Sequence, residues 1–231
     1  NMPIPLILAN PQRRSANFKS AQDNTSVSNV QQFLLTRIRD YSFAVIEHEA
    51  IQASQNNADA FVRYATMEID GAMHSLTRSL AISMYRDGTG SIGTLASDPG
   101  TSGAVITLAN PQDISNFEVG MVLNATAAAS ATGSLINFVA STDDATVTKV
   151  DRDAGTITLN ANTNAALEAG SFIFQKGDHS TGTARKVSGL EAWLPSSAPG
   201  GSDSFFGVNR SVDATRLGGI RVDGSSLPIE E

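Results

Sequence analysis

The segment from residue 58 to residue 86 constrains the fold most strongly. Its apolar residues recur every three or four positions, at Phe61, Ala65, Ile69, Ala72, Leu76, Leu80 and Met84. This period is that of an α-helix with one apolar face. About 29 residues, each rising roughly 1.5 Å, would span about 43 Å. The sequence therefore predicts a long spine helix whose apolar face is buried along its whole length.

Helix start and stop signals flank this segment. Asn56 or Asn57 can cap the first turn, and Asp59 suits the positive end of the helix dipole. Gly88 follows Arg86 as a C-terminal stop. These signals place the predicted helix between residues 58 and 86.

The chain before the helix predicts an arm followed by a strand. Residues 1–29 contain three prolines among many Asn, Ser and Gln residues, which is typical of an extended arm or loop. In residues 30–49, Tyr41, Phe43 and Val45 alternate with their neighbours at the period of a strand, and both faces are mostly apolar. We therefore expect an arm over residues 1–40, and a long strand, covered on both sides, that leads into the helix.

Short strand-like runs follow a Gly/Ser/Thr/Pro hinge at residues 88–103. The strand candidates are residues 104–108, 119–126, 135–139, 145–150, 156–160 and 171–175, with a hairpin turn at Asp153, Ala154 and Gly155. Strands at this spacing, with no helix between them, predict a small antiparallel barrel over residues 104–178, closed by its first and last strands. Eight acidic and three basic residues give this segment −5 of the chain's net charge of −7. We expect an inserted module that folds independently and faces solvent.

The composition bounds the function. With 231 residues, 41% of them hydrophobic, the chain can bury a core, and no run approaches the roughly 20 apolar residues of a membrane helix. Cysteine is absent, which removes disulfides, thiolate metal sites and cysteine nucleophiles. The net charge of −7 argues against a dedicated nucleic-acid binder. No membrane partner is expected, and any DNA contact should be weak.

One glycine-rich motif suggests a cofactor site. Residues 88–93 read Gly-Thr-Gly-Ser-Ile-Gly, which matches the dinucleotide fingerprint G-x-G-x-x-G. That fingerprint needs a strand before it and a helix N-terminus after it, whereas here a long helix precedes and a loop follows. A flexible exit from the helix is the preferred interpretation, and no cofactor is expected.

The other candidate chemical groups have structural explanations. Asp151 and Asp153 resemble the start of a calcium loop, but Ala161 occupies the position of the required Glu, so a tight hairpin is preferred. Asp70 and His74 lie four apart on the helix without an evident third metal ligand. His48, in the expected strand, and His179, in the loop leaving the barrel, have no recognisable catalytic partner. We expect no catalytic and no metal-binding residue.

The order of these segments resembles the major capsid protein of tailed bacteriophages. The similar runs are Pro3-Ile4-Pro5-Leu6 with Asn10-Pro11-Gln12 and Ser15-Ala16-Asn17-Phe18 (extended loop), Tyr41-Ser42-Phe43-Ala44-Val45-Ile46 (strand before the spine helix), Glu68-Ile69-Asp70-Gly71-Ala72 to Tyr85-Arg86-Asp87-Gly88 (spine helix), and Gly189-Leu190-Glu191-Ala192-Trp193-Leu194-Pro195 with Phe206-Gly207-Val208-Asn209-Arg210-Ser211 (crossing to the axial domain). The resemblance covers most of the chain outside the barrel, which looks like an insertion domain. Relatives usually extend further at both ends, so the resemblance implies a truncated chain.

The resemblance implies a Hong Kong 97-like α+β fold. The peripheral domain with the spine helix and the start of the axial domain would comprise residues 41–103 and 179–231. The function would be self-assembly into pentamers and hexamers and then an icosahedral shell around phage DNA, formed in the cytoplasm of the host bacterium. Scaffolding and decoration proteins are possible partners. The candidate subunit-contact residues, which could meet acidic neighbours or lie over a neighbouring subunit, are Arg13, Arg14, Phe18, Arg37 and Arg39.

Two other functions are open at this stage. A tail or adhesin-like component would use the barrel to bind a ligand, and would form trimers or respond to a sugar. An enzyme would rest on the glycine-rich motif alone. A capsid subunit instead predicts rings and shells.

Overall fold

The computed structural model describes residues 1–24, 26–53, 58–139, 142–181, 185–201 and 203–222. The structure is 27% helical and 25% strand, which agrees with the expected α+β class. The chain divides into two compact units. Unit 1 contains residues 1–37 and the described part of 193–231, and unit 2 contains residues 38–192. Asn56 and Asn57, the expected helix caps, lie outside the described residues.

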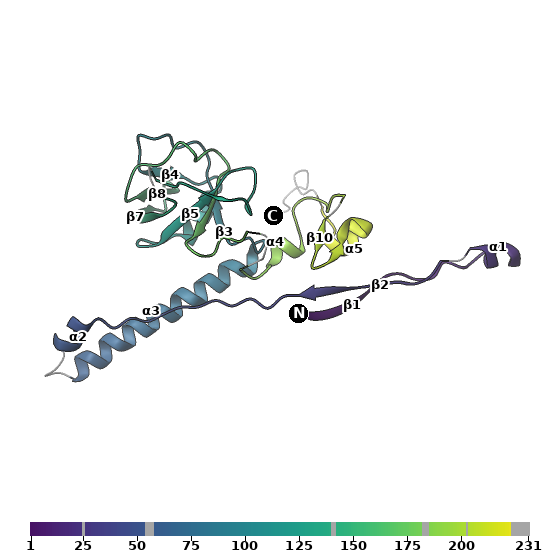
Figure 1. Ribbon diagram of the computed structural model, residues 1–231, viewed down its shortest axis with the longest axis horizontal. Coiled ribbons are helices and arrows are strands. Elements are labelled where there is room, and N and C mark those ends of the chain that lie inside the picture. Colours follow the sequence, from purple (N-terminus) through teal and green to yellow (C-terminus); the bar gives the residue numbers. More distant parts are fainter. Residues whose placement is uncertain (25, 54–57, 140–141, 182–184, 202, 223–231) are drawn as a thin grey trace, which may run out of the picture. The chain divides into compact units, whose positions relative to one another are not determined.

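Unit 1 contains a long two-stranded ribbon, which we call the arm (residues 1–37). Strands β1 (Met2–Ala9) and β2 (Asn29–Leu35) pair antiparallel, from Met2 opposite Leu35 to Ala9 opposite Asn29. The short helix α1 (Phe18–Asp23) lies at the far end of the ribbon (Figure 1). The prolines of β1 fit because both strands of such a ribbon are edges, where a missing N–H is tolerated. The expected extended arm is therefore a β-hairpin.

The base of the arm is held by the C-terminal part of unit 1. That part comprises Trp193 of α4 (Leu190–Trp193), the hairpin β10 (Ser204–Phe205) with β11 (Val208–Asn209), the 3-10 helix η2 (Arg210–Asp213) and α5 (Ala214–Gly218). The Leu34 N–H donates to the Phe206 carbonyl over 2.9 Å, and Arg216 donates to the Leu8 carbonyl over 3.2 Å. Phe33 packs edge-on against Trp193 and Phe205 at ring centroid distances of 5.7 and 6.3 Å.

Unit 2 contains the spine helix and the barrel. Helix α3 (Ala58–Tyr85) agrees closely with the predicted segment, and α2 (His48–Ala53) precedes it. The strand expected over residues 41–46 is not formed. That segment has no regular structure, and most of it is exposed. Its alternation did not produce a strand because no strand of the described residues pairs with it. His48 consequently lies on a helix, where its ring contacts the Gln52 amide at 3.1 Å.

The barrel contains seven strands. They are β3 (Ser91–Thr94), β4 (Val105–Thr107), β5 (Val122–Thr126), β6 (Leu135–Ile136), β7 (Ala145–Asp151), β8 (Thr156–Leu159) and β9 (Phe172–Gln175). Their order is β3-β9-β5-β7-β8-β4, with β6 paired to β5. A bridge between Leu95 and Leu108 joins the two ends of this order, and the Ala96 N–H donates to the Thr107 carbonyl over 2.9 Å. The sheet is therefore closed between β3 and β4, and not between residues 104–108 and 171–175 as the sequence predicted.

Two details of the predicted barrel are wrong. The strand β3 lies inside the expected hinge at 88–103, so the barrel begins at Ser91 and not at residue 104. The first predicted strand, β4, pairs with β8, while β9 pairs with β3. The short run Ser91-Ile92-Gly93-Thr94 gave no strand signal because it is mostly small and polar. Gly93 is small for a packing reason, since a Cβ there would lie 3.3 Å from the Phe117 ring.

Apolar side chains fill the barrel interior. Phe117 and Phe138 are completely buried in this core, together with Leu123, Ile157, Leu167 and Ile173, whereas Phe174, also completely buried, packs against His179 outside it. The 3-10 helix η1 (Pro111–Asn116) covers one side and contributes Ile114 to the core. The barrel is thus a packed core, which gives a ligand no room between these side chains.

The predicted apolar face of α3 is not covered in the described chain. Leu76, Leu80 and Met84 are 37%, 45% and 57% exposed. The face turned to the barrel instead carries Ser79, Ile82 and Ser83, and Ile82 packs against the barrel core. The helical period was predicted correctly, but the burial of its apolar face was wrong for the single chain. The barrel sits beside the polar face because Arg78 and Arg86 on that face have acidic partners in the barrel.

We predict that the different burial of the apolar and polar faces of α3 affects the free energy of unfolding. Leu76→Ala should lower the stability of the single chain by less than about 1 kcal/mol, since Leu76 is not fully buried. Arg78→Ala should lower it by about 1–3 kcal/mol, because it removes an ion pair to Glu118 and a hydrogen bond to the Ser115 carbonyl. Urea unfolding monitored by circular dichroism shows which of the two substitutions lowers the stability more. A larger loss for Leu76→Ala would contradict the observed helix orientation.

Candidate functional site

The expected subunit-contact residues fall into two groups. Arg13, Arg14 and Phe18 lie toward the far end of the arm, where Phe18 is 84% exposed and begins α1. Arg13 donates to the Ser26 carbonyl over 3.3 Å, which ties the two sides of the arm together. Arg37 and Arg39 are exposed and lie elsewhere in the chain, between β2 and α2. The structure therefore groups three of the five candidates.

The far end of the arm is locally well built. Asn17 caps α1, because its side-chain oxygen accepts from the Lys19 N–H over 2.9 Å. The Gln12 N–H donates to the Ser26 hydroxyl over 2.6 Å, across the two strands of the arm. None of the residues of α1 is buried. The far end of the arm is thus an ordered element that exposes the Phe18 ring and the Arg13 and Arg14 guanidinium groups. It does not pack on an apolar core.

The face of α3 toward the barrel carries two arginine clamps. Arg86 pairs with Asp113 at 2.6 Å and also donates to the Ile92 carbonyl over 3.1 Å. Arg78 pairs with Glu118. Burial, assisted by the nearby Arg152, lowers the pKa of Arg78 from its ordinary value. Some of the acidic residues predicted on the barrel surface, Asp113 and Glu118, thus hold the helix through these ion pairs.

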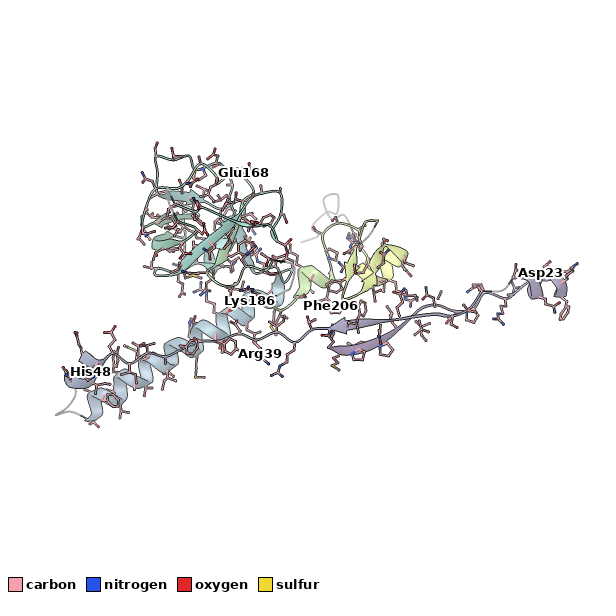
Figure 2. The ribbon with its side chains drawn as sticks, in the orientation of Figure 1. Asp23, Arg39, His48, Glu168, Lys186 and Phe206 are labelled. Carbon is pink, nitrogen blue, oxygen red and sulfur yellow. The ribbon has the colours of Figure 1, made fainter. Side chains whose placement is uncertain are left out.

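A buried lysine lies where three other segments meet. Lys186 is 8% exposed, and its ammonium donates to Asp40 and to the Ser79 hydroxyl, both over 2.8 Å. It also pairs with Asp178 at 3.0 Å. Ser79 in turn donates to Asp40 over 2.8 Å. Figure 2 labels Lys186 beside α3. The sequence analysis did not identify this cluster.

The two carboxylates of the cluster differ in acidity. Burial raises the pKa of Asp178 above its ordinary value, and this effect outweighs the nearby Lys186 ammonium. For Asp40, burial opposes ionisation, but hydrogen bonds from Lys186 and Ser79 outweigh burial and hold the pKa below its ordinary value. Burial therefore shifts the pKa of Asp178 upward, while the hydrogen bonds to Asp40 shift its pKa downward.

The glycine-rich motif at 88–93 has a packing explanation. Gly88 and Gly90 have φ of +89° and +91°, which favours glycine, and β3 follows directly where the cofactor fingerprint requires a helix. A Cβ on Gly90 would lie 2.3 Å from the Asp178 carbonyl, and one on Gly88 would lie 2.8 Å from the Ser188 hydroxyl. The chain thus enters and leaves the barrel side by side, and the glycines permit this approach.

The acidic turn at residues 151–155 closes the hairpin between β7 and β8. The Asp151 carboxylate accepts from the Ala154 N–H over 3.1 Å, and this hydrogen bond, with one from Lys149, lowers the pKa of Asp151. Gly155 has φ of +64°. The preferred reading as a tight hairpin is confirmed. Among the described residues, no group of three or more His, Asp or Glu side chains is arranged to hold a metal ion.

His179 is buried where the chain leaves the barrel. Its ring packs edge-on against Phe174 at 4.9 Å, and its Nε2 has no hydrogen-bond partner among the described residues. Burial, assisted by the charge of Arg185, lowers the pKa of His179 below its ordinary value of 6.5. The folded chain therefore holds this histidine neutral.

We predict that this histidine makes the chain less stable in acid. As pH falls below about 6.5, the unfolded chain takes up a proton that the folded chain resists, so the free energy of unfolding decreases. Urea unfolding at pH 7.5 and pH 5 should show a smaller pH difference for His179→Gln than for the wild type. His48→Gln, at an exposed position on α2, is the matched control and should keep the wild-type difference. Equal pH differences in all three chains would contradict the prediction.

Comparison of the chain with protein-family profiles, curated proteins and solved structures gives no significant match. No helix in the described part of the chain is long and apolar enough to cross a bilayer.

Proposed function

We propose that this chain is a subunit of a tailed-bacteriophage capsid with a Hong Kong 97-like fold and an inserted barrel. One observation carries the proposal. The chain has ordered elements whose apolar residues are left uncovered, namely the arm and the apolar face of α3. An assembly subunit requires such surfaces, because they become buried only against other copies.

The arm supports the proposal because a ribbon of this kind has little stability of its own. A two-stranded ribbon is marginally stable by itself in water. The arm exposes Met2, Ile7 and Val30 by 66%, 56% and 59%, and Phe18 by 84%. Such a ribbon is expected to gain stability by lying over a neighbouring subunit, with Arg13, Arg14 and Phe18 in contact with it. Repetition of that heterologous contact around a ring closes pentamers and hexamers.

The apolar face of α3 supports the same proposal. Ile69, Met73 and Met84 are between 49% and 62% exposed along this face. The neighbouring segment at 41–46 is also open, with Phe43 84% exposed. Exposed apolar surfaces of this kind are typical of interaction sites. In a shell they would be covered, and the barrel, whose core is complete, would be free to face solvent.

The proposed function requires no bond-making step and no cofactor. The barrel's acidic charge would disfavour close contact with packaged DNA, so contacts between the subunit and DNA should be weak. The proposed location is the virion capsid, assembled in the bacterial cytoplasm. The adhesin-like alternative would need a ligand site in the barrel, and the packed interior does not favour one.

The test is assembly of the protein after expression. Sedimentation and negative-stain electron microscopy should show rings or closed shells. Phe18→Ser should reduce the assembled fraction severalfold without changing the melting temperature, since this ring contributes no buried area in the single chain. The matched control is Val119→Ser, which also removes an exposed apolar side chain, 66% exposed, but on the barrel. It should assemble normally. Discrete trimers, or a change of state on adding sugars, would favour the adhesin-like function instead.

A further inference from the structure

Residues 38–47, which we call the strap, connect β2 to α2 without regular structure. Among the described residues, the side-chain hydrogen bonds and ion pairs of the strap with the rest of unit 2 come from Asp40, which accepts from the Ser79 hydroxyl and from Lys186, each over 2.8 Å. Tyr41, Phe43 and Val45 of the strap are more than half exposed. Asp40 is therefore the polar anchor of the strap on α3.

We propose that Lys186 is an ionic lock, whose buried ammonium holds the strap on α3 and ties both to the barrel exit. Lys186 follows the barrel, Asp178 is at the barrel exit, Asp40 is in the strap and Ser79 is on α3, so one charge joins four segments of unit 2. The inference does not depend on the proposed capsid function, because it concerns contacts within one chain.

The chemistry of the cluster makes the lock releasable. A buried ammonium needs its partners, since an unpaired charge in this position is unfavourable. Removing the ammonium leaves Asp40 and Asp178 facing each other, and among the described residues Arg185 and Arg86 are further charged groups near the cluster. The two carboxylates would repel, and the strap is the less firmly held of the two partners. Asp178 is fixed by the backbone of the barrel exit, where its N–H donates to the Gln175 carbonyl over 3.0 Å.

The barrel should survive release of the lock. Its core consists of residues other than these four, and the Arg86–Asp113 and Arg78–Glu118 pairs still hold it on the helix. Loss of the lock therefore has a distinctive signature. The strap separates from α3 while the barrel remains folded and docked.

The absence of cysteine allows this signature to be measured by site-specific labelling. Spin labels at Phe43→Cys and Met73→Cys, which are 84% and 62% exposed, report the distance from strap to helix. A second pair at Val119→Cys and Met73→Cys reports the distance from barrel to helix. In the full chain, Lys186→Met should broaden the first distance distribution and leave the second unchanged.

The matched control is Lys176→Met, because Lys176 also pairs with an aspartate but is exposed on the barrel. It should change neither distance. If Lys186→Met unfolds the barrel, Asp40→Ala removes the strap's partner alone and should give the same release. An unchanged strap distance in Lys186→Met, or in Asp40→Ala where that variant is used, overturns the lock.

Discussion

Replacing Gly90 by alanine is expected to lower the stability of unit 2 by about 3 kcal/mol or more. Two causes combine. The backbone at Gly90 has φ of +91°, which disfavours any residue with a side chain. The added Cβ would lie 2.3 Å from the Asp178 carbonyl oxygen, a rigid backbone atom. The entry and exit of the barrel would have to separate, and this would strain β3 against β9.

Two other glycines allow the backbone strain and the steric contact to be measured separately. Gly177 has a similar φ of +93°, but a Cβ there meets nothing within 4 Å, so Gly177→Ala should show the backbone strain alone, about 1–2 kcal/mol. Gly71 lies inside α3 with open space around it, so Gly71→Ala should stabilise the helix by up to about 1 kcal/mol. Thermal unfolding of the three variants gives the order. An effect at Gly90 no larger than that at Gly177 would show that the close approach to Asp178 does not exist.

The periodic segments of the fold could be predicted from the sequence. Helix α3 was predicted because its apolar spacing persists over many turns. The six strand candidates from residue 104 to residue 175 all contain strands, because short apolar runs there are separated by turn residues such as Gly155. These signals are local, so they could be read without any knowledge of the partners in space.

The predictions failed where a partner decides the outcome. The segment 41–46 has the alternation of a strand, but a strand also needs a neighbour to pair with. The apolar face of α3 has the pattern of a buried surface, yet the described chain places Ser79, Ile82 and Ser83 against the barrel. Conversely, β3 is formed by small and polar residues because β9 pairs with it. The sequence pattern of a segment does not identify the segment that packs against it. That partner decides which side chains are buried in the single chain.

The Lys186 cluster could not have been predicted for a related reason. Asp40 and Lys186 are separated by 146 positions, and Ser79 and Lys186 by 107. No rule based on sequence spacing connects residues that lie so far apart along the chain. The only local signal was that a lysine in a Gly/Ser-rich stretch is followed by an apolar run at 187–194, and this signal does not indicate burial.

The barrel should fold alone only when β3 is included. A segment of residues 90–181 contains every strand of the closed order, so we expect dispersed amide resonances and a single cooperative melt. A segment of residues 103–179 lacks β3. It would leave β9 with one edge unpaired and remove Ile92 and Leu95 from the core. An open barrel of this size loses both a row of hydrogen bonds and part of its core, so we expect no cooperative melt.

The two segments form a matched pair, because they share all other strands and all three completely buried phenylalanines. Nuclear magnetic resonance spectra and calorimetry of both, under the same conditions, decide the boundary. A folded shorter segment would show that β3 is an addition to the barrel and not part of it. An unfolded longer segment would show that the barrel depends on α3, through Ile82 and the two arginine clamps. In that case the barrel and the helix would form one folding unit, and the barrel could not be regarded as an independent insertion.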